Sequence, residues 1–150
     1  MAPGWSKSPA RVLAYGWAFP ATTIGLALVA IAAATGSRVS VVDGVIEAHS
    51  GVLSPILRRW VPLRGGASAM TLGHVVVARD ASALDRTRAH ERVHVKQAER
   101  WGPLFIPAYF IASLVVAMRG GHYYRDNRFE RDAVASSELT GKRTPGGGAS

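Results

Sequence analysis

Residues 80–101 read DASALDRTRAHERVHVKQAERW and carry one continuous helical pattern, which Gly102-Pro103 ends. Asp80 or Ser82 can cap the start of this helix. One stripe of the helix follows a spacing of three to four residues: Ala83, Thr87, His90, His94, Gln97 and Trp101. Charged residues occupy most of the remaining surface, so this stripe is expected to face inward. The stretch therefore predicts an amphipathic helix with two histidines on its sheltered side.

His90 and His94 are one helical turn apart, so both imidazoles can bind one ion from the same side. The chain has no cysteine, which leaves histidine and carboxylate as ligands, and this ligand set suits zinc. Zinc lowers the pKa of a coordinated water to about 7, and Glu91 is placed to accept the proton of that water. The pattern predicts a Zn²⁺ site and metal-assisted hydrolysis with Glu91 as the general base.

The segments upstream of this helix predict short strands. Residues 40–48, SVVDGVIEA, contain two β-prone runs around Asp43-Gly44, which is typical of a hairpin turn. Thr71–Arg79 is rich in β-branched residues and is expected to form one strand directly before the helix. Strands next to a long amphipathic helix favour an α+β fold.

Two further helices are expected downstream. Residues 104–118 carry no charge, which fits a helix that is buried in the core or lies in a membrane surface. After a turn at Gly120-Gly121, Asp126 or Asn127 can cap a helix that continues to about Leu139.

The strand-then-helix order and the motif His90-Glu91-Arg92-Val93-His94 resemble the zincin metallopeptidases, whose fold packs an edge strand above the motif helix. With Gln97, the motif also resembles small bacterial metallopeptidase-like domains. It departs from the metzincin pattern, which has glycine and histidine where this chain has Gln97 and Arg100. The resemblance is therefore to the gluzincin group, in which a second helix supplies a glutamate as the third ligand.

Glu130 lies in the first turn of the downstream helix and is the third ligand that this resemblance implies, with His122 and Asp126 as alternatives. Gluzincins carry an aspartate four residues after the ligand to orient a histidine, and Val134 stands there in this chain. Asp132 is the acidic residue that would replace it as an outer partner of a ligand.

Three residues before the ligand helix are candidates for contact with a reacting group. His122, Tyr123 or Tyr124 could donate a hydrogen bond to the oxyanion of a tetrahedral intermediate. Two adjacent tyrosines are equally typical of a membrane surface, where their rings are apolar and their hydroxyls meet water.

Residues 12–37 contain no charged side chain and exceed the roughly 20 residues that a transmembrane helix needs. They are interpreted as a retained anchor, and the alternative is a signal peptide with Lys7 and Arg11 as its basic start. These two cations favour a cytoplasmic N-terminus. A second span at 104–118 would place Glu130 across the membrane from His90, so a zinc site and a second span exclude each other.

The sequence thus predicts an α+β protein with a basic N-terminus (1–11), a transmembrane anchor (12–37), a minimal zincin-like domain (38–139) of short antiparallel strands and two ligand helices, and a disordered tail (140–150). The expected function is that of a membrane-anchored zinc metallopeptidase, single-pass in a bacterial plasma membrane. Its polypeptide substrate would add as a strand to Thr71–Arg79.

The rival interpretation is a non-enzymatic basic membrane protein with two spans, which binds a partner or anionic lipid. The net charge of +8 comes from 18 basic and 10 acidic residues. The arginines are scattered and form no basic stripe between exposed aromatic residues, so no nucleic-acid partner is expected. Attraction to the lipid bilayer explains the charge instead.

Overall fold

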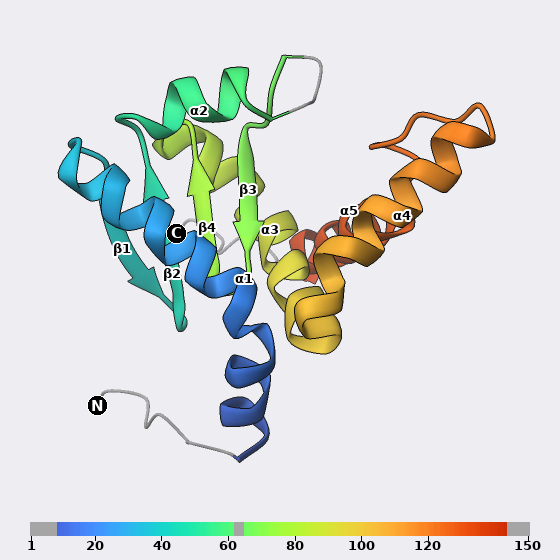
Figure 1. Cartoon of the computed structure of the whole chain (residues 1–150), viewed down its shortest axis with the longest axis horizontal. Coiled ribbons are helices and arrows are strands. Elements are labelled where there is room, and N and C mark those ends of the chain that lie inside the picture. The colour runs from blue at the N-terminus through green and yellow to red at the C-terminus, as the bar shows by residue number, and fades with distance from the viewer. Residues whose placement is uncertain (1–8, 62–64, 144–150) are drawn as a thin grey trace, which may run out of the picture.

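The computed structural model describes residues 9–61 and 65–143. Its helices and strands follow in the order α1 (Pro9–Ala34), β1 (Arg38–Val42), β2 (Val45–His49), α2 (Leu53–Arg59), β3 (Ala69–Leu72), β4 (Val75–Ala78), α3 (Ala81–Trp101), the 3-10 helix η1 (Gly102–Leu104), α4 (Phe105–Met118) and α5 (Arg128–Arg143). The strands form one mixed sheet in the order β1-β2-β4-β3. The predicted α+β class is confirmed (Figure 1).

The hairpin predicted at Asp43-Gly44 joins β1 to β2. The two strands are antiparallel, with Val42 opposite Val45. Asp43 and Gly44 have φ angles of 51° and 77°, the left-handed conformation that a two-residue hairpin turn requires of both central residues. This prediction is confirmed.

The prediction of one strand over Thr71–Arg79 is wrong, because the chain reverses at Gly73. β3 and β4 are antiparallel, with Leu72 opposite Val75. Gly73 has a φ of 62°, and a side chain there would collide with Thr22 of α1. The run of β-branched residues concealed this turn, since it continues with little change on both sides of the glycine.

The sheet is also mixed rather than antiparallel, because β4 pairs in parallel with β2. All four residues of β4 are buried, as expected for a strand that is covered on both faces. Val75 and Val77 pack against α1 and α2, whereas Val76 and Ala78 pack against α3. β4 is therefore the centre of a three-layer arrangement.

α1 lies directly on the sheet. The residues that α1 buries follow a spacing of three to four: Ala18, Ala21, Gly25, Val29 and Ala32. A side-chain carbon at Gly25 would lie 2.7 Å from Cβ of Val75, so only glycine permits this close approach. The small residues of α1 thus form a flat surface against which the sheet packs.

A buried ion-pair cluster fixes α3 on the opposite face. Glu47 of β2 is only 1% exposed and pairs with Arg88 at 3.0 Å and Arg92 at 2.8 Å. Arg92 also donates to the carbonyl oxygen of Val42 at 2.8 Å. Two cations on one carboxylate offset the cost of burying it, and because Arg88 and Arg92 are one turn apart in the middle of α3, they fix the rotation of this helix relative to the sheet.

α5 packs against α3, where Phe129 joins a cluster with Ala98 and Phe105. It continues to Arg143, so the predicted tail begins within this helix, and residues 144–150 lie outside the described part of the chain. The predicted basic N-terminus overlaps the start of α1 at Pro9, and residues 1–8 are likewise outside it.

Two helical stretches of the described chain are long and apolar enough to cross a membrane: Gly16–Ala34, and a window within Ala81–Met118. By length and composition alone, the first could be a membrane span or a signal sequence, and the core helix of a soluble protein would meet the same criteria. α4, which was expected to be buried or to lie in a membrane, buries only Phe105.

Candidate metal centre

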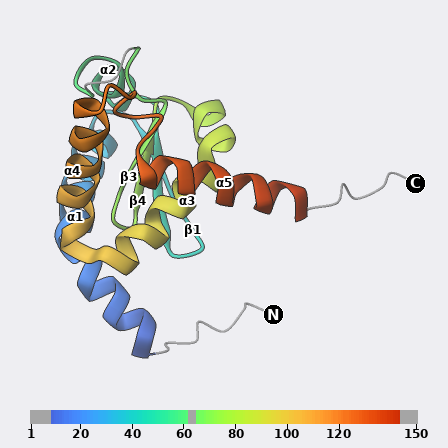
Figure 2. The ribbon, with the colours of Figure 1, turned by 90° about the vertical axis from the view of Figure 1, so that its right-hand side faces the viewer.

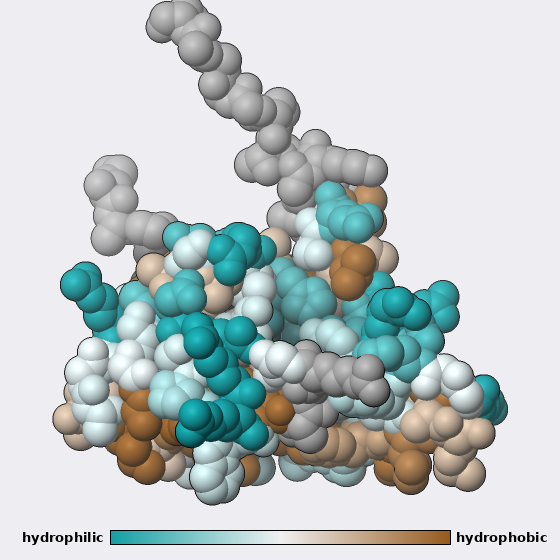
Figure 3. Space-filling model, turned by 90° about the horizontal axis from the view of Figure 1, so that it is seen from above, coloured by the Kyte–Doolittle hydropathy of each residue, from teal (hydrophilic) through white to brown (hydrophobic). Residues whose placement is uncertain are grey.

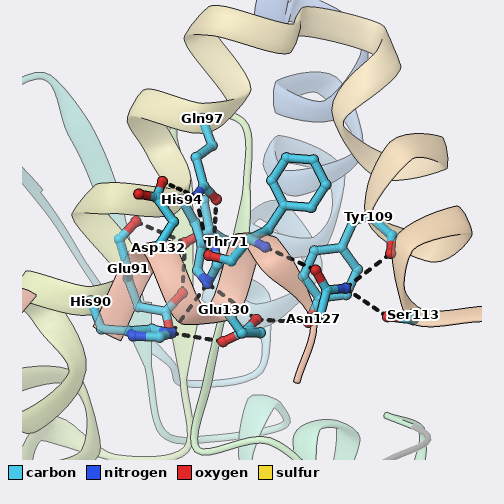
Figure 4. Close-up of polar contacts among 11 residues, drawn as sticks. Thr71, His90, Glu91, His94, Gln97, Tyr109, Ser113, Asn127, Glu130 and Asp132 are labelled. Atoms are coloured by element: carbon cyan, nitrogen blue, oxygen red, sulfur yellow. Dashed lines mark hydrogen bonds and ion pairs between the residues drawn. The ribbon is translucent and has the colours of Figure 1, made fainter. Parts of the chain in front are cut away.

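His90, His94 and Glu130 come together between α3 and α5 (Figure 4). Nε2 of His94 lies 3.1 Å from Nε2 of His90 and 3.3 Å from Oε1 of Glu130. Nε2 of His90 lies 3.1 Å from Oε2 of Glu130. The three side chains are a group that could hold a metal ion.

The dimensions of this group can be compared with those of a zinc site. An ion with tetrahedral bonds of about 2.0–2.1 Å holds its ligand atoms about 3.3 Å apart. The two imidazole nitrogens are 3.1 Å apart, but they contact different oxygens of Glu130, and with one ligand atom from each residue the three atoms lie within 4.8 Å of one another. Catalytic zinc sites can bind the ion through two imidazoles and one carboxylate, and the fourth coordination position is then open to water or substrate.

Gln97 sets the orientation of His94. Nδ1 of His94 lies 2.8 Å from Oε1 of Gln97. An amide oxygen can only accept a hydrogen bond, so the proton of the neutral ring is on Nδ1 and the lone pair of Nε2 points into the group. Gln97, one turn after His94, thus orients an imidazole of the group that could hold a metal ion.

Gln97 is held in turn by α5. Its Nε2 donates to the carbonyl oxygen of Phe129 at 3.1 Å and to Oδ2 of Asp132 at 2.9 Å. Asp132 therefore orients a histidine through Gln97 rather than by direct contact. A chain from carboxylate to amide to imidazole of this kind fixes the tautomer and the ring position of a ligand.

Tyr109 of α4 is a residue of the site that sequence reasoning missed. Its hydroxyl donates to Oε1 of Glu130 at 2.7 Å. Burial and the neighbouring Glu130 charge raise the pKa of Tyr109 well above its usual range, so the hydroxyl stays protonated. The sequence signal was one tyrosine within the apolar window 104–118, which could not be told from an interfacial tyrosine.

Asn127 connects the ligand helix to α4. It is fully buried, and its Oδ1 accepts from the backbone N–H of Phe129 at 2.9 Å, as a helix cap does. Its Nδ2 donates to the carbonyl oxygen of Tyr109 at 3.0 Å and to Oγ of Ser113 at 2.7 Å. One side chain thereby positions both Glu130 and the tyrosine that bonds to it.

Glu91 faces the edge strand. Its Oε2 accepts from the hydroxyl of Thr71 in β3 at 2.7 Å. Burial raises the pKa of Glu91, although the nearby His94 and the Thr71 hydrogen bond act in the opposite direction. A carboxyl with a raised pKa can hold and release a proton near neutral pH.

The pKa shifts favour the ionised form of Glu130, which can bind a cation, and they also favour a proton on His94, which competes with a cation. Burial alone would raise the pKa of Glu130, but hydrogen bonds from His90 and His94 outweigh it and hold the pKa well below its usual range. Burial would lower the pKa of His94, but Glu130, together with Glu91 and Gln97, outweighs burial and raises it. In the metal-free protein, an ionised Glu130 thus stabilises a proton where a cation would bind.

The other predicted residues lie in different places. Tyr124 is close enough for Glu130 to raise its pKa together with burial. His122 is exposed, and its Nδ1 accepts from the backbone of Arg125 at 3.2 Å. Asp126 accepts from the backbone of His122 at 2.8 Å. His122 and Asp126 therefore stabilise the turn between α4 and α5, and neither belongs to the metal group.

No family model matches this chain, and neither a curated protein nor a solved structure matches it. The chain thus has a candidate site of two histidines and a glutamate that could hold a metal ion, and no relative assigns it a reaction.

Proposed function

We propose that this chain is a membrane-attached, zinc-dependent hydrolase that cleaves peptide bonds. The observation that carries the proposal is the meeting of His90, His94 and Glu130, whose ligand atoms, one from each residue, lie within 4.8 Å of one another and could hold a metal ion. The zincin resemblance of the motif helix supports a peptide as the substrate.

Zinc bound here would supply a Lewis acid for a carbonyl oxygen and would make a water acidic near neutral pH. Glu91 accepts the proton of the attacking water and then passes it to the leaving amine. Its raised pKa suits both steps, since the carboxyl must gain and lose one proton in each cycle. Tyr124 keeps its hydroxyl proton, because burial and the neighbouring Glu130 raise its pKa, and it would donate a hydrogen bond to the oxyanion.

The edge strand β3 is the proposed support for the substrate. Arg79 N–H donates to Ser68 O at 3.0 Å, and the alternation of an antiparallel ladder then turns the backbone groups of Ala69 and Thr71 away from β4. An extended peptide could pair with these groups. Thr71 would thus contact the substrate through its backbone and Glu91 through its hydroxyl.

The test compares zinc content and cleavage of a fluorogenic peptide library in purified full-length variants. Glu91→Gln is expected to keep zinc and to lose about 10²–10⁴-fold of the rate. His90→Ala should lose both zinc and cleavage. Two exposed controls, Glu138→Gln and His122→Ala, should keep both.

Stoichiometric zinc without cleavage in the wild type would indicate a structural metal site. Full cleavage by Glu91→Gln would remove this residue as the general base. Absence of stoichiometric zinc would refute the proposal as a whole.

A further inference from the structure

α1 and α4 lie on the same side of the molecule. Figure 1 shows α1 in front of the sheet and α4 to its right, and Figure 2 shows both helices along one edge, from which α5 extends away. In Figure 3, hydrophobic residues gather along the lower edge, which is the side that faces the viewer in Figure 1. The two uncharged windows of the sequence therefore share one face.

The side chains on this face are large, apolar and exposed. On α1, Trp17, Ile24 and Ile31 recur every seven residues, and on α4 the exposed residues include Ile111, Leu114 and Met118. Ile24, Ile31, Ile111 and Leu114 are 59%, 58%, 62% and 60% exposed. Soluble monomers rarely expose a continuous apolar surface of this kind, and such surfaces mark contact with a protein or a membrane.

The inner side of each helix is already in use. α1 buries its small residues against the sheet, so it cannot cross a bilayer alone without uncovering Val75 and Val77. α4 carries Tyr109, which donates to the ligand Glu130. Each helix can meet lipid with its outer side only, which is the geometry of a helix that lies in a membrane surface.

The surrounding charge favours lipid over a second copy of this chain. The exposed Arg38 and Arg119 follow the two apolar helices, and the chain carries a net charge of +8. Two such copies would repel each other, whereas anionic headgroups attract basic residues by about 1 kcal/mol each. Half-exposed Trp17 is of the type that concentrates at the boundary between lipid and water.

We infer that α1 and α4 together form a face that lies in the surface of an anionic bilayer, and that neither helix crosses it. This revises the expected single-pass anchor and does not depend on the proposed hydrolase activity. Because Tyr109 is on the inner side of α4, the metal group would be held about one helix diameter, roughly 10 Å, from the lipid.

The chain has no cysteine, so single cysteines can carry spin labels without background. Full-length Ile24→Cys, Ile31→Cys, Leu114→Cys and, as a control on α5, Val134→Cys would be placed in phosphatidylcholine vesicles with phosphatidylglycerol. Label depth would be read from accessibility to oxygen and to a nickel chelate. All four side chains are exposed, so the fold should tolerate each change.

The expected result is one shallow depth for the labels at 24, 31 and 114, with the label at 134 in water. A spanning α1 would separate positions 24 and 31 by about 10 Å in depth and leave position 114 in water, and this would overturn the inference. Labels that all stay in water, or that contact each other in a dimer, would also overturn it.

Discussion

The inner and outer sides of α4 depart from the usual burial pattern of a helix, in which apolar residues are buried and polar residues are exposed. Its inner side takes part in a buried polar site, where Tyr109 donates to Glu130 and Asn127 is fully enclosed. Its outer side exposes Ile111, Leu114 and other large apolar residues. Buried polar groups and exposed apolar groups are the two informative departures from normal burial. The polar contacts lie on one side of α4 and the exposed apolar groups on the other, which is the arrangement that the proposed bilayer-facing surface requires.

The largest expected effect concerns the polar side. Glu130→Ala removes one of three ligands and the carboxylate that holds both imidazoles, at 3.1 and 3.3 Å. We expect loss of stoichiometric zinc, measured by competition with a chelator. Glu138→Ala on the exposed part of the same helix should bind zinc as the wild type does. If Glu130→Ala kept wild-type affinity, the third ligand would have to be a different residue.

Gln97→Ala should weaken zinc binding by about 10–100-fold, the usual cost of losing an outer partner of a ligand. The reason is that Nδ1 of His94 would lose its acceptor at 2.8 Å. The adjacent exposed Lys96→Ala is the matched control. Equal affinities in the two variants would mean that Gln97 serves only the packing of α5.

Zinc affinity should also fall as the pH is lowered. Glu130 raises the pKa of His94. A proton therefore begins to compete with the metal at a higher pH than it does on an unperturbed histidine side chain, whose pKa is about 6.5. Below the His94 pKa, each pH unit should cost about tenfold in affinity for each proton displaced. Titration of zinc at several pH values, beside a free imidazole reference, measures the onset. An onset below that of the reference would contradict the assigned contacts.

Asn127 connects α5 to α4, and Asn127→Ala would break this connection. It removes a helix cap and leaves the hydroxyl of Ser113 and the carbonyl of Tyr109 without their donor. A loss of about 1–2 kcal/mol in the free energy of unfolding is expected, with weaker zinc binding as a consequence. Denaturant unfolding in detergent would measure the first effect. Unchanged stability would show that this connection is unimportant.

The smallest effect is expected on the apolar side. Leu114→Ser should change the free energy of unfolding in detergent by less than about 0.5 kcal/mol, because its side chain is exposed. Val75→Ala in the buried core is the contrasting variant and should cost more, since it leaves a cavity. A large loss in Leu114→Ser would mean that this face packs against protein.

The sequence predicted the motif helix and the site best where the signals are local. The spacing of His90 and His94 and the Asp43-Gly44 turn depend on residues close in the chain, and the structure places them as expected. Glu130 lies 36 residues after His94, and only the family resemblance implied that it would meet the histidines. Its meeting with the histidines agrees with that implication.

Non-local features were missed because no local pattern encodes them. At the Gly73 turn, the close approach of Thr22 in α1 leaves no room for a side chain. The parallel pairing of β2 with β4 joins strands that are separated in the sequence by α2 and β3. Tyr109 and Thr71 reach the site from elements whose periodicity indicated only apolar packing. The uncharged windows indicated membrane contact but not its geometry, since length alone fits spanning and surface-lying helices equally.

X-ray absorption at the zinc edge, on full-length protein loaded with one zinc, tests the central assignment most directly. The geometry of His90, His94 and Glu130 predicts two imidazole nitrogens and carboxylate oxygen at about 2.0–2.1 Å in a four-coordinate shell. The imidazole scattering should diminish in His90→Ala and stay unchanged in His122→Ala. A shell of oxygen alone, or an imidazole signal that is the same in His90→Ala, would contradict the assignment.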